Sequence, residues 1–248
     1  MRQRVDVVVL TWNDGDLLEK AVGSALSSAD IDVEVIIVDN GSDQSPTVPD
    51  DPRVHLHRNQ INRGVAPARN QGVELSDAPV ACLLDSDARL EPDALARMVE
   101  VLDGDPRIAV VGPVFSGQLA EASAGIAPAL GVKLARVLNL RSSYRPVERS
   151  GTSWDVDFCI GACQVIRRTA WDQVEGLDES YFYGPEDVDF CLRLREAGWR
   201  IVQTSEAVVH HPPRRRFRGL LTRKGLNHGW AVARHLWRHR RFSARVRR

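Results

Sequence analysis

The chain has 248 residues, enough to bury a sizeable core, and a single large α/β domain is the default expectation. Its composition, 43% hydrophobic and 27% charged, is that of a globular protein, and no run of about 18 apolar residues predicts a membrane-spanning helix. The formal net charge is +0. The apolar run near the start is short and lacks a secretory cleavage site, so we expect a cytoplasmic protein.

Strand and helix patterns alternate through the first hundred residues. Apolar runs predict strands at 5–10, 33–38 and 80–84, and the stretch "VHLHRN" predicts a shorter one. Helical spacing predicts helices over 16–27 and 66–75, and a third that opens at Glu91-Pro92-Asp93 and closes at Gly104. This alternation predicts a mostly parallel sheet with helices on both faces.

Polar residues follow three of these strands directly. They are Thr11 to Asp14, Asp39 to Ser42, and Asp85 to Asp87. In open α/β sheets, ligands bind outside the carboxyl ends of the strands, so we expect these three groups to share one rim.

The stretch "CLLDSD" runs from a buried strand into two carboxylates, Asp85 and Asp87. Two acids at this spacing, beside a crevice of nucleotide size, suit a hard divalent cation that holds a diphosphate. A solvated turn is the alternative for an arbitrary pair of acids. Neither a G-x-G-x-x-G nor a G-x-x-x-x-G-K-[ST] phosphate loop follows the first strand, which reads "LTWND". A metal ion is the remaining simple way to neutralise a diphosphate.

Six motifs resemble those of family 2 glycosyltransferases with the GT-A fold, and they occur in the family's order. They are "VVVLTWND", "VIIVDNGSDQS", "NRGVAPARNQG", "LLDSDARLEPDAL", "GLDESYFYGPEDVDFCLRLREAGWRI" and "AVVHH". The resemblance covers about residues 5–211 and is strongest to bacterial transferases that add rhamnose, galactofuranose or related sugars to cell-surface glycans. It implies a GT-A nucleotide-diphospho-sugar transferase fold.

The resemblance also implies roles for individual residues. Nucleotide-sugar binding is implied for Thr11, Asp39, Arg63, Arg69, Asp85, Ser86 and Gly161. Asp87 and His210 are implied as metal ligands, with the adjacent His211 as an open alternative for the histidine. Each of these roles has a competing interpretation. Arg63 and Arg69 would be exposed charges beside a helix, Gly161 would mark a strand bulge, and His210 would be a structural residue.

The stretch "GPEDVDFCLRLREAGWR" predicts an amphipathic helix with Glu186 and Asp187 in its first turn. Acids at this position stabilise a helix dipole, but three acids in four residues exceed that need. By resemblance, Asp187 is the catalytic base that activates the acceptor hydroxyl, Glu186 orients the acceptor or the loop, and Asp189 supports the helix. Tyr181, Phe182 and Tyr183, just upstream, are candidates to wall a sugar pocket.

Together these features predict an inverting, metal-dependent enzyme that moves a sugar from a nucleoside-diphosphate sugar to a hydroxyl acceptor in cell-surface glycan synthesis. Mn²⁺ or Mg²⁺ is the expected cofactor, UDP or dTDP the favoured carrier, and a glycan or lipid-linked molecule the acceptor. The alternatives are a polyprenyl-phosphate sugar synthase of the same fold and a catalytically silent member that binds a nucleotide or glycan.

The charge is divided unevenly along the chain. Of the 33 Lys and Arg residues, 13 lie in 212–248 without an acid, so 20 remain beside all 33 acids in 1–211. We therefore divide the chain into a catalytic domain, 1–211, and a basic amphipathic tail, 212–248. Residues 213–248 predict either peripheral association with an anionic membrane or a helix packed on the body. No recognised nucleic-acid-binding motif accompanies the charge, so no nucleic-acid partner is expected.

The four cysteines, Cys82, Cys159, Cys163 and Cys191, form no CxxC pair and lie in apolar surroundings. A cysteine in such surroundings behaves as a small hydrophobic residue. The sequence therefore predicts four buried free thiols.

Overall fold

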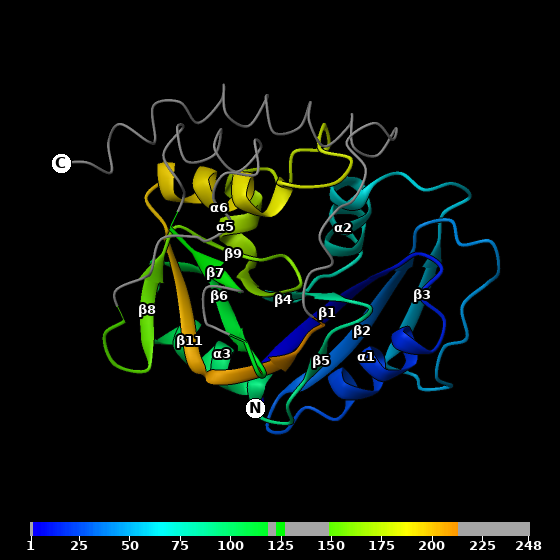
Figure 1. The fold of residues 1–248 in the computed structure, drawn as a ribbon, viewed down its shortest axis with the longest axis horizontal. Coiled ribbons are helices and arrows are strands. Elements are labelled where there is room, and N and C mark those ends of the chain that lie inside the picture. The colour runs from blue at the N-terminus through cyan, green and yellow to red at the C-terminus, as the bar shows by residue number, and fades with distance from the viewer. Residues whose placement is uncertain (1, 119–122, 127–148, 213–248) are drawn as a thin grey trace.

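A computed structural model describes residues 2–118, 123–126 and 149–212 (Figure 1). The strands are β1 (Arg4–Thr11), β2 (Asp32–Asp39), β3 (Val54–Arg58), β4 (Val80–Asp85), β5 (Arg89–Leu90), β6 (Ile108–Phe115), β7 (Ala124–Gly125), β8 (Ser153–Val156), β9 (Phe158–Cys159), β10 (Cys163–Arg167) and β11 (Arg200–His210). The helices are α1 (Asp16–Leu26), α2 (Val65–Glu74), α3 (Ala94–Gly104), α5 (Arg168–Gln173) and α6 (Glu186–Glu196).

A nine-stranded sheet runs in the order β3-β2-β1-β4-β10-β6-β11-β5, with β8 paired to β11. Strands β3, β2, β1 and β4 are parallel, and β6 is parallel to β11. Because β10 is antiparallel to both β4 and β6, these two strands also point the same way. The prediction of a mostly parallel sheet is confirmed.

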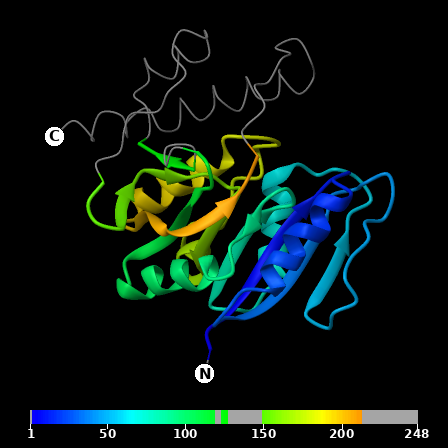
Figure 2. The ribbon, with the colours of Figure 1, turned by 60° about the horizontal axis from the view of Figure 1, so that its bottom comes forward.

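Helices cover both faces of this sheet, with α1 and α3 on one side and α2 and α6 on the other (Figure 2). Close packing explains why "NQGVE" carries a glycine in α2: a Cβ at Gly72 would lie 2.2 Å from Cγ1 of Val8 in β1. On the opposite face, the guanidinium of Arg167 in β10 donates to the carbonyl of Leu102 in α3. The core between these layers consists mainly of Val, Ile, Leu and Ala.

The predicted elements appear within two residues of the observed ends, with one correction. The helix expected to open at Glu91-Pro92-Asp93 begins at Ala94 instead. The preceding residues are held in a turn: the amide of Glu91 donates to Val208 in β11, and the carbonyl of Pro92 accepts from Ala29. These contacts with other elements keep the proline outside the helix.

All four cysteines are buried and free, as predicted. Burial raises the pKa of Cys191 to about 12, so this thiol stays protonated at neutral pH. Within the described residues, no helix is both long enough and apolar enough to cross a membrane.

Candidate active site

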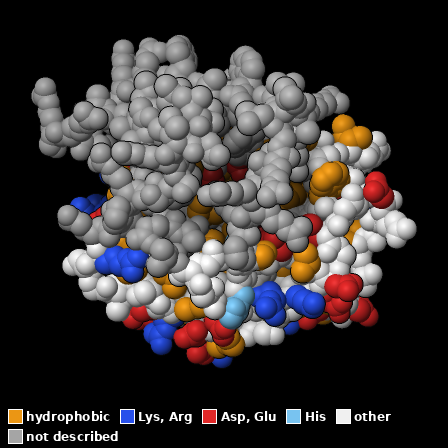
Figure 3. Space-filling view, in the orientation of Figure 1, with side chains coloured by type: hydrophobic (Ala, Val, Ile, Leu, Met, Phe, Trp, Pro, Cys, Tyr) orange, Lys and Arg blue, Asp and Glu red, His pale blue; other side chains and the backbone are white. Residues whose placement is uncertain are grey.

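Three strand ends meet at one edge of the sheet, as the alternation predicted. The register pairs Thr11 with Asp39 and Leu10 with Asp85, so the polar residues that end β1, β2 and β4 lie on adjacent strands. Figure 3 shows acidic side chains near the middle of one face of the molecule. This edge is where a parallel sheet offers a ligand crevice.

Asp14 joins two of these strand ends. The hydroxyls of Thr11 and Ser86 both donate to its Oδ2, the first across 3.1 Å. The backbone amide of Trp12 donates to the same oxygen. Asp14 was expected on the rim without a role of its own; here it fixes Ser86, between the two acids of "DSD", against the end of β1.

Asp39 is fully buried at the end of β2. Its Oδ1 accepts from the amide and the hydroxyl of Ser42, and Nε of Arg58 lies 3.0 Å from its Oδ2. Nη2 of Arg58 also donates to the carbonyl of Ser42. The carboxylate is therefore held by its own turn and by β3, a partner that the sequence did not indicate.

A candidate metal centre lies at the end of β4. Asp85, Asp87 and His211 each offer one ligand atom, and these atoms lie within 4.8 Å of one another. Nε2 of His211 is 3.4 Å from Oδ1 of Asp87, and its ring packs against Phe115 with the ring centroids 4.9 Å apart. Two carboxylates and an imidazole form a donor set that Mn²⁺ accepts, so these residues fit a divalent cation.

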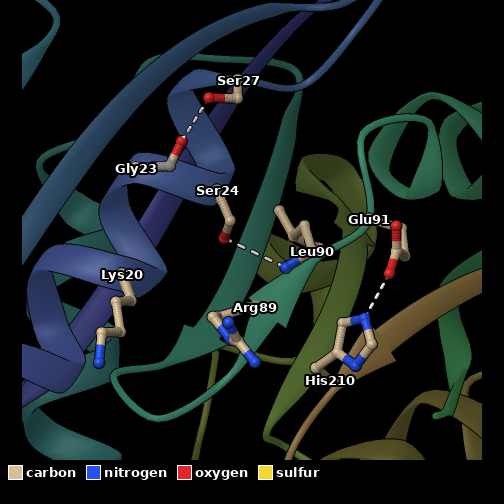
Figure 4. A pocket seen from close by; sticks show the side chains of 8 residues that line it. All are labelled: Lys20, Gly23, Ser24, Ser27, Arg89, Leu90, Glu91 and His210. Atoms are coloured by element: carbon tan, nitrogen blue, oxygen red, sulfur yellow. Dashed lines mark hydrogen bonds and ion pairs between the residues drawn. The ribbon is translucent and has the colours of Figure 1, made fainter.

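The neighbouring His210 points elsewhere. Its Nε2 pairs with Glu91, and both side chains line a hollow with Lys20, Arg89 and residues of α1 (Figure 4). His210 is the last residue of β11 and His211 is the first residue beyond it, and the two side chains have different partners. Of the two histidines left open by the sequence, His211 is the one beside Asp85 and Asp87.

Arg69 is buried in α2 and reaches three acceptors. Its guanidinium donates to Oδ1 of Asp85 at 2.6 Å, to the carbonyl of Gly161 at 2.8 Å and to Oε1 of Glu186 at 3.3 Å. The acids raise the pKa of Arg69 against the opposing effect of burial. The alternative of an exposed helix-flanking charge is wrong for Arg69. It fits Arg63, which is exposed.

Gly161 lies between β9 and β10, where the chain has no room for a side chain. A Cβ there would lie 2.4 Å from Nη1 of Arg69. The amide of Gly161 donates to Oδ2 of Asp187 across 2.9 Å. Gly161 therefore contacts both Arg69 and the first turn of α6, and its position reflects close packing rather than a strand bulge.

Glu186 and Asp187 are both buried at the start of α6. Burial, together with the neighbouring Asp187, raises the pKa of Glu186 to about 7, although Arg69 acts in the opposite direction. A carboxyl group with its pKa near neutrality is a common feature of functional sites.

The next acid, Asp189, supports the helix as expected. It accepts from the hydroxyl of Tyr181 and pairs with Arg193 one turn later. Tyr181 is fully buried, which corrects its expected place in a sugar-pocket wall. Phe182 and Tyr183 are exposed.

The chain is similar to known proteins over most of its length. Residues 6–174 match the family model described as glycosyl transferase family 2. An N-acetylglucosaminyl-diphospho-decaprenol L-rhamnosyltransferase of Mycobacterium tuberculosis is 28% identical over 236 residues, covering 85% of this chain and 77% of the relative. A pre-mycofactocin glycosyltransferase of the same organism is 32% identical, covering 92% of this chain and 47% of its own length.

Two solved structures share the fold at low sequence identity. GalNAc-T7 with UDP, GalNAc and Mn²⁺ aligns with a TM-score of 0.72 and 15% identity, covering 95% of this chain and 48% of its own. A mannosyltransferase of Pyrobaculum calidifontis, in complex with GDP-Man and Mn²⁺, aligns with a TM-score of 0.68 and 18% identity, covering 97% of this chain and 65% of its own. The GT-A fold predicted from the sequence is confirmed.

Proposed function

This chain belongs to glycosyl transferase family 2, and from that premise we propose that it transfers a sugar from a nucleoside-diphosphate sugar to a hydroxyl acceptor by a metal-dependent, inverting reaction. The observation that carries the proposal is the cluster of Asp85, Asp87 and His211, whose ligand atoms lie within 4.8 Å of one another at the end of β4. Both solved structures that share this fold contain a nucleotide or nucleotide sugar together with Mn²⁺.

Asp87 and His211 are the proposed metal ligands, and Asp85, which belongs to the same cluster, accepts a hydrogen bond from the buried Arg69. A bound Mn²⁺ or Mg²⁺ would stabilise the negative charge that grows on the departing nucleoside diphosphate. Thr11, Asp39 and Ser86 lie along the same rim and are proposed to contact the nucleoside, for which UDP or dTDP is our favoured carrier.

Asp187 is the proposed catalytic base. An acceptor hydroxyl is a poor nucleophile until a carboxylate within hydrogen-bond reach accepts its proton in the transition state. The amide of Gly161 holds one oxygen of Asp187 in place, which fixes the direction of the side chain. Attack from the side opposite the leaving group inverts the anomeric carbon. Glu186, paired with Arg69, is proposed to position this first turn of α6.

The acceptor is proposed to be a lipid-linked glycan of the cell surface. One relative is named for a diphospho-decaprenol acceptor. The 13 bases of 212–248 would favour a cytoplasmic protein held peripherally at an anionic membrane. Apart from Pro212, this tail lies outside the described residues. The amphipathic pattern of its sequence is what supports the proposed membrane association.

Calorimetry with UDP, dTDP and GDP, in Mn²⁺ and in EDTA, tests the proposal. We expect at least one nucleotide to bind in Mn²⁺ and to lose most of its affinity in EDTA. Asp87→Ala should abolish the Mn²⁺-dependent part, because it removes a metal ligand. Asp93→Ala, an exposed acid before α3, is the matched control and should bind as the parent does. Equal affinity of the Asp87 variant and the parent would contradict the proposal.

A further inference from the structure

Arg69 is a single buried cation shared by two carboxylates from separate parts of the chain. Asp85 belongs to the candidate metal cluster, and Glu186 precedes the proposed base in α6. Asp85 lies 16 residues from Arg69 in the sequence, and Glu186 lies 117 residues from it. Asp85 accepts from Nη2 of Arg69, and Glu186 accepts from Nη1. Among the residues that the structure describes, this guanidinium donates to the two acids and to the carbonyl of Gly161.

The surroundings keep this arrangement from relaxing. The Arg69 side chain is 6% exposed and that of Glu186 is 8% exposed, so water screens the pair poorly. Oε1 of Glu186 pairs with Nη1 of Arg69 at 3.3 Å, whereas its buried Oε2 has no hydrogen-bond partner within the described residues. Because Gly161 has no Cβ, Nη1 of Arg69 can occupy the space where that atom would lie.

We infer that Arg69 couples the donor half of the site to the acceptor half, so that the charge of Glu186 on α6 sets how strongly Asp85 supports metal and nucleotide binding. This inference rests on the proposed function, since it assumes a metal-bound nucleotide at Asp85 and Asp87. It makes Arg69 and Glu186 positioning residues rather than direct ligands of the diphosphate.

The direction of the coupling follows from the charges. When Glu186 is ionised, it balances the cation that lies 2.6 Å from Asp85. Without that charge, Arg69 holds Asp85 more strongly and repels the metal ion. The Glu186→Gln variant, which keeps the shape of the side chain, should therefore bind Mn²⁺-nucleotide more weakly by about 3- to 10-fold, as expected for one charge acting across a partly screened interior.

The test is calorimetry of Mn²⁺ with UDP, or with whichever of dTDP and GDP the parent binds best, at about pH 8, where the Glu186 carboxyl is mostly ionised. Glu196→Gln is the matched control, because it makes the same charge change at the other, exposed end of the same helix. The control should bind as the parent does. Circular dichroism establishes that each variant is folded.

An Arg69→Met/Glu186→Gln double variant separates electrostatic coupling from a structural role. Removing the cation together with its partner should raise affinity above that of Glu186→Gln, because no unbalanced charge then remains beside Asp85. A structural role predicts the opposite, a double variant weaker than Glu186→Gln. Parental affinity in Glu186→Gln, or a double variant that binds no more tightly than Glu186→Gln, would overturn the inference alone. A parent without Mn²⁺-dependent nucleotide binding would overturn the proposed function and the inference together.

Discussion

At the residue scale, the direction of one side chain decides which histidine meets the acids. His210 is the last residue of β11 and pairs with Glu91, whereas His211 faces Asp87 and packs against Phe115. The two positions are inequivalent even though they are adjacent, because the strand ends between them. His211 is therefore the histidine whose ring nitrogen lies near the carboxylates of Asp85 and Asp87.

His211→Ala is predicted to weaken Mn²⁺-dependent nucleotide binding by about 10-fold or more, because it removes an imidazole from the metal cluster. His210→Ala is the matched control and should change this affinity by less than about 2-fold. Titrations of both variants in Mn²⁺ and in EDTA distinguish them. A larger loss in the His210 variant would reverse the assignment.

Residue patterns predicted which polar residues share one edge of the sheet, because acids that end buried strands are delivered there. Thr11 and Asp85 lie on adjacent strand ends, and Asp87 lies near Asp85, as this pattern predicted. The partners of Arg69 could not be found, since its contacts span 117 residues of sequence and depend on how α6 docks. Arg58 was missed for the same reason: its contact with Asp39 requires the β2–β3 register.

At the element scale, the packing of α2 on the sheet places Arg69. Gly72 lies one turn beyond Arg69 in α2 and permits close approach to Val8 in β1 and Val38 in β2. The helix was predicted from its spacing within a residue or so at each end. The distance of α2 from the sheet could not be predicted, because a glycine in a helix does not indicate which side chain packs against it.

Gly72→Ala is predicted to destabilise the protein by about 1–3 kcal/mol, because the new methyl group would overlap Cγ1 of Val8. For a chain of this size that lowers the melting temperature by roughly 2–4 °C per kcal/mol. Gly104→Ala, at the end of α3 with nothing within 4 Å of the added Cβ, should show no such loss. Equal melting temperatures for the parent and the Gly72 variant would refute the packing argument.

At the scale of the whole molecule, an acidic body is joined to a basic tail. Residues 1–211 hold all 33 acids, and 212–248 hold 13 bases. Attraction between basic segments and anionic lipid is worth about 1 kcal/mol per Lys or Arg near the surface and weakens as salt is added. The zero net charge of the chain therefore conceals two regions of opposite net charge.

The full-length protein is predicted to sediment with vesicles that contain phosphatidylserine at low ionic strength, and to be released by added salt. Zwitterionic vesicles serve as the control and should leave it in the supernatant. Deletion of 213–248 should abolish the sedimentation while Mn²⁺-dependent nucleotide binding is retained. Full-length protein that ignores anionic vesicles would exclude the membrane role of the tail.

The central claim is that Asp187 acts as a base in sugar transfer, and Asp187→Asn tests it most directly. The variant keeps the shape and a hydrogen bond to the amide of Gly161, but it cannot accept a proton. Measured beside donor affinity in Mn²⁺, the rate of transfer should fall by roughly 10²-fold or more while donor affinity stays nearly unchanged. Transfer at the parental rate by folded Asp187→Asn protein would contradict the account.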